Sequence, residues 1–334
     1  MEATGGERGE HGRRAPREGA LTDPAGRTAP ARSASVPATT ASAPAFAAAL
    51  DPIGSWIAEG VIARAAAVVR HDGAIVAERY WGSATDGGAL DAGTLFPFAS
   101  LTKPSLATAI LRLVERGALS LELTVGDALP EAPGETRQVT IAQLLTHTAG
   151  VPEHVPGGEA LEARQAPVAE YVRATLAGGL LFQPGTRVLY SNAGFQVLGA
   201  VVERATGVAV ADLLDRETFA PAGMASATLR PLTRPGARVA RVELGAARAA
   251  DPRTEIYNSP YFKRLARADA GLFATVRDVA TLLELYRVGG GGVLSPAMAR
   301  GAVTSHTHGI PGRYGPYEWE SCDFGWGWEV KGGK

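Results

Sequence analysis

The sequence predicts an α+β fold on three observations: two adjacent strand patterns over residues 65–81, a long middle with apolar residues at helical spacing, and a strand pattern near residue 330. A doubly wound α/β fold would require strands that alternate with helices along the whole chain. Of the 334 residues, 46% are hydrophobic and 20% are charged, so the chain can bury a sizeable core.

Residues 1–45 are predicted to form a disordered tail. They are rich in Ala, Gly, Pro, Arg, Thr and Ser and contain no periodic large apolar residues. Arg13 and Arg14 are followed by Ala-Pro-Arg-Glu instead of an apolar stretch, so no secretory signal is predicted and a cytoplasmic location is expected. Two explanations of the segment stay open: a genuine tail, or a start codon assigned upstream of the true one.

Order is expected to begin with a helix over about residues 46–57. A buried strand over 65–70, a His-Asp-Gly turn at 71–73 and a return strand over 74–81 predict a hairpin. Apolar residues at helical spacing then predict a helix from Ser100 to Arg116.

The later elements are mainly helical. Thr275, followed three residues on by Asp278, has the pattern of a capping box. The glycines at 289–292 lack the Gly-Lys-Ser/Thr continuation of a phosphate-binding loop, so a plain loop is expected there. Helices are predicted over about 140–147, 168–177, 192–205, 208–218 and 275–287, and a strand is predicted over 326–330.

Ser100 and Lys103 are the first candidates for chemistry. Three residues apart at the start of a predicted helix, the hydroxyl and the amine share one helix face. The free N–H groups of a helix N-terminus favour negative charge, so the Ser100 N–H can form half of an oxyanion hole. A base must be neutral to accept the serine proton, and burial can neutralise lysine but not arginine. Lysine occurs only at positions 103, 263, 331 and 334, so chance gives roughly one Ser-x-x-Lys per six such chains.

Tyr190-Ser191-Asn192 is the second candidate group. The Tyr190 hydroxyl can relay protons to and from a leaving group. The Asn192 amide has both a donor and an acceptor, which suits it to hold the lysine and a substrate carbonyl. Taken alone, the tripeptide also fits a core tyrosine before a helix N-cap. Asparagine occurs only at 192 and 258, so chance gives Tyr-x-Asn roughly once in twenty chains.

Together these motifs resemble the serine β-lactamase and D-alanyl-D-alanine peptidase superfamily, in particular its class C-like branch with the bacterial carboxylesterases. The resemblance covers about residues 46–330, with its motifs in the family order. They are Pro97-Phe98-Ala99-Ser100-Leu101-Thr102-Lys103, Leu144-Leu145-Thr146-His147-Thr148-Ala149-Gly150, Tyr190-Ser191-Asn192-Ala193-Gly194, Pro221-Ala222-Gly223-Met224 and Ala270-Gly271-Leu272-Phe273-Ala274-Thr275.

The resemblance implies an antiparallel sheet flanked by helices plus a mainly helical part, at about 104–265, within one domain over 46–334. It implies Ser100 as the acylated nucleophile, Lys103 as its base and Tyr190 as the proton relay. The position of Asn192 is less uniform in the esterases, and its amide chemistry leads us to expect a substrate-binding residue. His147 lies outside the family's catalytic group and is expected to be a hydrogen-bonded structural histidine.

Proteins of this type carry a third motif, Lys/His/Trp-x-Gly, on a strand that lines the site. Lys331-Gly332-Gly333 fits the formula but follows the predicted 326–330 strand directly, without the turn and new strand of the family. We therefore expect that the chain stops before this motif and lacks the C-terminal strands. The activity of a chain without them is in question.

Composition excludes several other classes. The formal net charge is −1, from 33 basic and 34 acidic residues, so neither a nucleic acid nor an anionic membrane is an expected partner. The lone Cys322 predicts no internal disulfide. No cofactor and no metal are expected, because His306-Thr307-His308 is thin evidence for a metal site. The absence of Gly-x-Ser-x-Gly argues against an α/β-hydrolase.

The expected activity is that of a serine hydrolase, preferably a carboxylesterase, which cleaves a small-molecule ester or lactam through an acyl-enzyme. A β-lactamase, a D-alanyl-D-alanine carboxypeptidase and a non-catalytic ligand-binding homologue or inactive fragment remain as alternatives. The substrate depends on the loops at 151–167 and 228–260, and the sequence predicts no oligomeric state.

Overall fold

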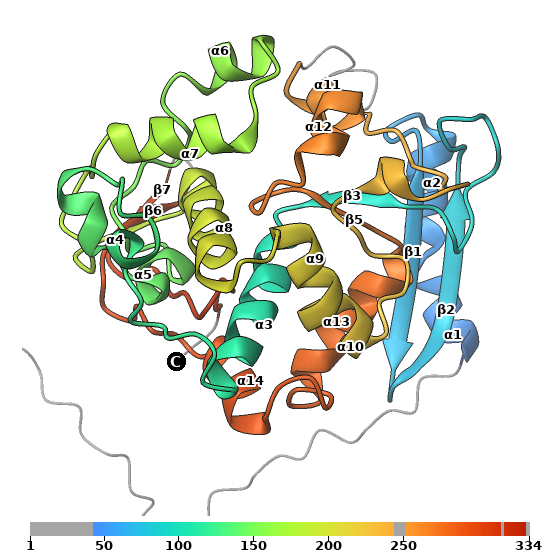
Figure 1. Ribbon diagram of the computed structural model, residues 1–334. Helices are drawn as coiled ribbons and strands as arrows, with labels where there is room; N and C mark the ends of the chain where they lie inside the picture. Colours follow the sequence, from blue (N-terminus) through green and yellow to red (C-terminus); the bar gives the residue numbers. More distant parts are fainter. Residues whose placement is uncertain (1–42, 244–251, 315–316, 332–334) are drawn as a thin grey trace, which may run out of the picture. The chain divides into compact units, whose positions relative to one another are not determined.

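The computed structural model describes residues 43–243, 252–314 and 317–331 (Figure 1). The described residues all belong to one compact unit, Ser42–Lys334. The expected disordered tail therefore lies almost wholly outside the described residues. Its last three residues belong to helix α1 (Ala43–Ala48).

The predicted N-terminal hairpin is confirmed. Strands β1 (Ala65–His71) and β2 (Ala74–Trp81) pair antiparallel around a two-residue turn. Asp72 and Gly73 have φ values of 47° and 80°, as a type I′ turn requires. Helix α13 (Val276–Arg287) packs against β1, and α1 packs against β2. Each strand of the hairpin therefore has a helix packed against it, one from before the hairpin and one from much later in the chain (Figure 1).

The helix expected over 46–57 is divided into α1 and α2 (Asp51–Ala58). Pro52 is the cause, because its ring clashes with the carbonyl four residues back and ends a continuing helix, whereas it fits the first turn of a new one.

Helix α3 (Thr102–Glu115) lies at the centre of the main hydrophobic core. It begins two residues after the predicted start, because Ser100 and Leu101 form a turn. Leu106, Ala109 and Ile110 are fully buried, as their helical spacing predicted. Helices α8 (Asn192–Thr206) and α9 (Val210–Leu214) pack against α3.

A short two-stranded sheet, not predicted from the sequence, leads into α3. Strand β3 (Phe96–Ala99) pairs antiparallel with β5 (Leu272–Ala274). Pro97 and the lengths of four and three residues hid both strands from pattern analysis. The pairing brings the turn at Ser100 beside the segment 267–271.

A third sheet joins β4 (Val188–Leu189), β6 (Gly312–Tyr314) and β7 (Tyr317–Trp319) in the order β4-β6-β7. The strand predicted over 326–330 is wrong, because this stretch has only an isolated bridge between Phe324 and Glu329. Its aromatic residues fill gaps between helices: Trp326 packs against the cores around α3 and α14 (Pro296–Ala302).

Most of the other predicted helices are confirmed. The predicted capping box is present, since Thr275 and Asp278 exchange side-chain and backbone hydrogen bonds at the start of α13. The predicted 208–218 helix is α9 continued by a π-helical turn, η2 (Asp215–Phe219), and by α10 (Ala220–Ala222). The remaining elements are α4 (Val125–Ala128), η1 (Gly134–Gln138), α5 (Ile141–Leu145), α6 (Gly158–Ala163), α7 (Val168–Ala177), η3 (Pro231–Thr233), α11 (Pro252–Asn258) and α12 (Pro260–Leu265).

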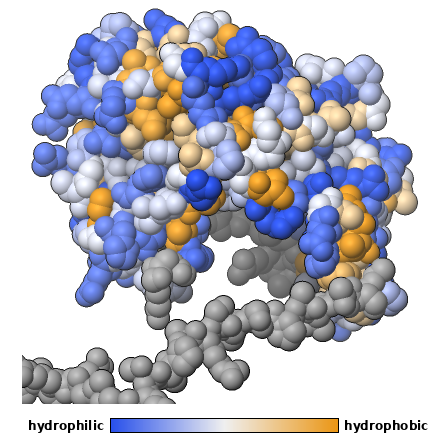
Figure 2. Space-filling view, turned by 90° about the horizontal axis from the view of Figure 1, so that it is seen from below, coloured by the Kyte–Doolittle hydropathy of each residue, from blue (hydrophilic) through white to orange (hydrophobic). Residues whose placement is uncertain are grey.

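The α+β class is confirmed: in the described part of the chain, small sheets are flanked by helices. None of the helices described here is long and apolar enough to cross a membrane. On the face in Figure 2, hydrophobic residues are interspersed among hydrophilic ones. Exposed apolar side chains scattered in this way are ordinary on protein surfaces.

Candidate active site

Ser100 occupies an exposed turn between β3 and α3. The preceding Ala99 has a φ of 43°, in the left-handed region that a residue with a Cβ rarely adopts. Thr102 holds this turn: its hydroxyl donates to the Ala99 carbonyl at 2.6 Å and accepts from the Leu272 N–H at 2.8 Å. The hydroxyl of Ser100 is thereby presented at the N-terminus of α3 by a strained but doubly fixed backbone.

Lys103 is buried directly behind Ser100, with 2% of its surface exposed. Its Nζ is 3.2 Å from Ser100 Oγ, 2.7 Å from Asn192 Oδ1 and 3.0 Å from the backbone oxygen of Asp269. Burial lowers the pKa of Lys103 to about 8, against an opposing effect of the Asp269 carboxylate and with a smaller lowering by Arg267.

These three neighbours fit a neutral amine. Asn192 Oδ1 and the Asp269 carbonyl can only accept hydrogen bonds, and a neutral amine has two protons to donate to them. In that neutral form the lone pair is left for the third neighbour, the Ser100 hydroxyl, whose Oγ lies 3.2 Å away. The geometry thus allows Lys103 to receive the serine proton.

Tyr190 follows β4 and faces the same hydroxyl. Its Oη lies 2.9 Å from Ser100 Oγ, and the Lys103 Nζ lies 4.8 Å from the centroid of its ring. Asn192 is the first residue of α8, whose N-cap Ser191 accepts a hydrogen bond from the Gly194 N–H. The structure thus brings together all four candidates, Ser100, Lys103, Tyr190 and Asn192.

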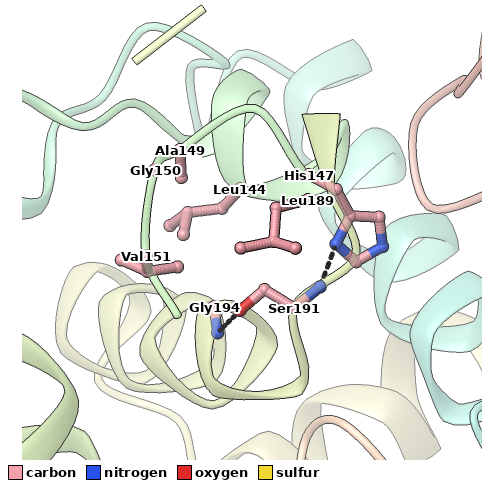
Figure 3. A pocket seen from close by; sticks show the side chains of 8 residues that line it. All are labelled: Leu144, His147, Ala149, Gly150, Val151, Leu189, Ser191 and Gly194. Atoms are coloured by element: carbon pink, nitrogen blue, oxygen red, sulfur yellow. Dashed lines mark hydrogen bonds between the residues drawn. The ribbon is translucent and has the colours of Figure 1, made fainter. Parts of the chain in front are cut away.

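His147 packs against Tyr190, with ring centroids 4.5 Å apart. Its Nδ1 accepts from the Ser191 N–H at 3.0 Å, so the expectation of a hydrogen-bonded histidine is confirmed. Burial, and next the charge of Lys103, hold the pKa of His147 well below its usual value. Figure 3 shows this bond at a small pocket that leaves no room for a water molecule and is lined by both apolar and polar side chains.

Sequence reasoning missed Arg267 and Asp269. The Asp269 carboxylate is buried and accepts two hydrogen bonds from Arg267, at 3.0 Å from Nε and 2.7 Å from Nη2. Burial would raise the pKa of Asp269, but the charge and hydrogen bonds of Arg267 outweigh it and lower that pKa. The only sequence signal was a pair of opposite charges directly before the Ala270-Gly271-Leu272 motif.

Other candidates from the sequence lie apart from this group. His306 stacks on Trp326 with ring centroids 4.2 Å apart, whereas His308 pairs with Asp323 at 3.1 Å. In the described ranges, no group of three or more His, Cys, Asp or Glu side chains could hold a metal ion. Lys331 is exposed and pairs with Glu329, and the glycines that follow it lie outside the described residues. The expectation that the chain stops before the third motif therefore stays a prediction.

Small sheets flanked by helices, with a serine and a buried lysine at the start of a central helix, define the serine β-lactamase and transpeptidase class of fold. The family model described as Beta-lactamase matches residues 45–334. The chain therefore belongs to the beta-lactamase family.

Named relatives agree with this membership. The chain is 39% identical over 178 residues to Esterase EstB of Burkholderia gladioli, covering 48% of this chain and 45% of the esterase. It is 33% identical over 165 residues to Penicillin-binding protein 4 of Amycolatopsis lactamdurans, covering 48% of this chain and 42% of that protein. The matches thus span less than half of the length of either relative.

The fold is shared with solved structures. The octameric penicillin-binding protein homologue from Pyrococcus abyssi aligns with a TM-score of 0.66 at 23% identity, covering 83% of this chain and 63% of that one. At this identity the likeness concerns the fold alone.

Proposed function

We propose that this chain is a carboxylesterase that cleaves a small carboxylic ester through an acyl-enzyme on Ser100. One observation carries the proposal: Lys103 Nζ is hydrogen-bonded at once to Ser100 Oγ, Asn192 Oδ1 and the Asp269 carbonyl. Two of these partners occupy the protons of a neutral amine and leave its lone pair for the serine. The group is therefore poised as a nucleophile with its base.

Acylation begins when Ser100 Oγ attacks the ester carbonyl carbon and its proton passes to Lys103 Nζ. The new C–O bond forms a tetrahedral intermediate, whose oxyanion faces the N–H groups at the start of α3. As the intermediate collapses, the bond to the leaving alcohol breaks and the Tyr190 hydroxyl donates a proton to the departing oxygen. Lys103 then returns its proton to the tyrosine oxygen, so both side chains regain their initial state.

Deacylation reverses these roles with water as the nucleophile. Tyr190 and Lys103 take a proton from the water as its oxygen attacks the acyl carbon. The bond to Ser100 then breaks, and Ser100 Oγ recovers a proton from the same pair. The net products are a carboxylic acid and an alcohol, and no oxidant or cofactor is needed.

An ester is preferred over a lactam or a D-alanyl peptide on grounds of similarity. The 39% identity to a protein named Esterase EstB supports esterase activity, although it covers 48% of this chain. The 33% identity to a penicillin-binding protein keeps a β-lactam or a D-alanyl-D-alanine peptide as the alternative substrate, because the acyl chemistry is the same. The remaining alternative to an enzyme is a non-catalytic homologue that binds such ligands without turnover.

A fluorophosphonate probe tests the nucleophile, since it labels only an activated serine. We expect labelling of the full chain and its loss in Ser100→Ala. Ser105→Ala is the matched control, because Ser105 lies on the same helix but is fully buried and donates to the Leu101 carbonyl. Labelling that persists in Ser100→Ala, or none in the parent chain, would contradict the proposal.

The substrate class is tested by turnover of two chromogenic compounds. We expect kcat/KM for p-nitrophenyl acetate to exceed that for a chromogenic cephalosporin by at least about tenfold, and both activities to vanish in Ser100→Ala. A larger kcat/KM for the cephalosporin would favour the lactamase alternative over the esterase.

A further inference from the structure

The tight turn at 267–271 places a buried ion pair directly behind Lys103. Gly271 N–H donates to the Arg267 carbonyl at 2.9 Å, and a Cβ on Gly271 would lie 2.6 Å from that oxygen. Gly199 of α8 lets the turn approach, because a Cβ there would lie 2.5 Å from the Ala268 Cβ. The position of Asp269 is thus set by close backbone packing on α8.

Arg267 occupies both carboxylate oxygens of Asp269. Its guanidinium also lies over the rings of Tyr171 and Phe262, with its Cζ at 5.9 and 5.6 Å from their centroids. A planar cation held by a bidentate carboxylate and two aromatic faces has little freedom to move. The carboxylate therefore points at the arginine, while the backbone carbonyl of the same residue meets Lys103 Nζ.

We propose that Arg267 and Asp269 are positioning residues for Lys103. Their ion pair fixes the Asp269 carbonyl as a hydrogen-bond acceptor for the amine and keeps the Asp269 carboxylate from pairing with it. A free carboxylate beside Lys103 would hold the lysine protonated and useless as a base. The inference deepens the proposed function, on which it rests.

The charged and titratable groups around Lys103 come from each segment packed against it. They are Tyr190 after β4, His147 after α5, and Asp269 and Arg267 before β5. The Asp269 carboxylate raises the pKa of the lysine and Arg267 lowers it, so removing one or the other should have opposite effects. The other two groups are unchanged in the variants below.

The test is whether substitutions of Arg267 and of Asp269 shift the titration midpoint of Lys103 in opposite directions. In Arg267→Met the midpoint should rise by about one pH unit, and in Asp269→Asn it should fall by about one unit. Midpoints that move in the same direction, or that do not move, would overturn the inference. Arg277→Met is the matched control, because Arg277 makes a similar bidentate pair with Glu78 on the exposed side of the hairpin.

Carbon-13 NMR of chains grown with labelled lysine measures this titration directly. The sequence has lysine only at 103, 263, 331 and 334, so the buried residue gives one of few signals, and exposed Lys331 is an internal reference. Done in a Ser100→Ala background, the titration does not depend on turnover. A parent chain that the fluorophosphonate probe does not label would refute the proposed function, whereas unshifted titration midpoints would refute the positioning role.

A double variant covers the case in which a single change prevents folding. Arg267→Met with Asp269→Asn removes both charges and leaves no unpaired buried ion. Because the two electrostatic effects cancel, its midpoint should lie between those of the single variants. Its rate of fluorophosphonate labelling should still fall about tenfold, because the acceptor carbonyl is no longer fixed. A double variant that keeps the labelling rate of the parent would overturn the inference.

Discussion

The amide oxygen of Asn192 lies 2.7 Å from Lys103 Nζ, the shortest of the three hydrogen bonds that the lysine makes. The two residues are 89 positions apart and come from the first turns of α8 and α3. The beginnings of two central helices thus converge on one amine.

Asn192→Asp should shift the activity to higher pH, because a carboxylate in contact with Lys103 raises the pKa of the lysine. At pH 7 the hydrolysis of p-nitrophenyl acetate should fall at least about tenfold and recover in part as the pH rises. Asn258→Asp is the control, since Asn258 binds the Val242 backbone and is the only other asparagine. A pH profile in Asn192→Asp identical to that of the parent would contradict this.

Acylation of the parent chain should accelerate with pH. The neutral form of Lys103 is the competent one and dominates above its pKa of about 8. Between pH 6 and 9 the neutral fraction rises about 90-fold, and the labelling rate should follow it. Lys103→Arg should remove the dependence and lower the rate about 10²–10⁴-fold, because arginine stays protonated. Lys263→Arg should keep the parent profile; a profile without a midpoint near 8 would argue against Lys103 as the base.

Tyr190→Phe should lower kcat about 10²–10⁴-fold, because the hydroxyl at 2.9 Å from Ser100 Oγ is lost. The fold should persist, since the phenyl ring still packs against His147 and Phe324. Tyr286→Phe makes the same chemical change at a partly buried tyrosine bonded to Thr108, and it should alter stability without altering kcat. Equal kcat values in the two variants would exclude Tyr190 as the relay.

Gly327→Ala should destabilise the protein more than Gly309→Ala. Both glycines have a φ of 78°, so alanine costs about 1–2 kcal/mol of backbone strain at either position. A Cβ on Gly327 would also lie 2.6 Å from the Ala107 Cβ of α3, whereas none of the described atoms lies within 4 Å of one on Gly309. Urea unfolding should therefore show about 1–3 kcal/mol of extra loss at Gly327. Equal losses of unfolding free energy in the two variants would mean that the 321–331 segment shifts without cost to make room for the added methyl group.

The sequence predicted the parts of the site that local spacing controls. Ser100 and Lys103 share a helix face because they are three residues apart, and the Thr275–Asp278 capping box marked the start of α13. It could not predict Asp269, because that residue acts on Lys103 through a backbone carbonyl that every residue type has.

The errors in the fold arose where tertiary contacts decide the structure. Trp326 to Val330 has the composition of a strand, but its backbone finds only one bridge and its aromatic rings pack between helices. The β3–β5 pair was missed because its strands are short and Pro97 interrupts one of them.

The bond between the Leu272 N–H and the Thr102 hydroxyl joins residues 170 positions apart, and it sets when the site can exist during folding. Closing so long a loop costs chain entropy before any contact rewards it, and contacts of this range are made slowly. The backbone hydrogen bonds within α3 join residues only four positions apart and need no such loop closure. After dilution from denaturant, the circular dichroism of the helices should therefore recover before the serine becomes reactive, and a nascent chain should be helical before it can be acylated.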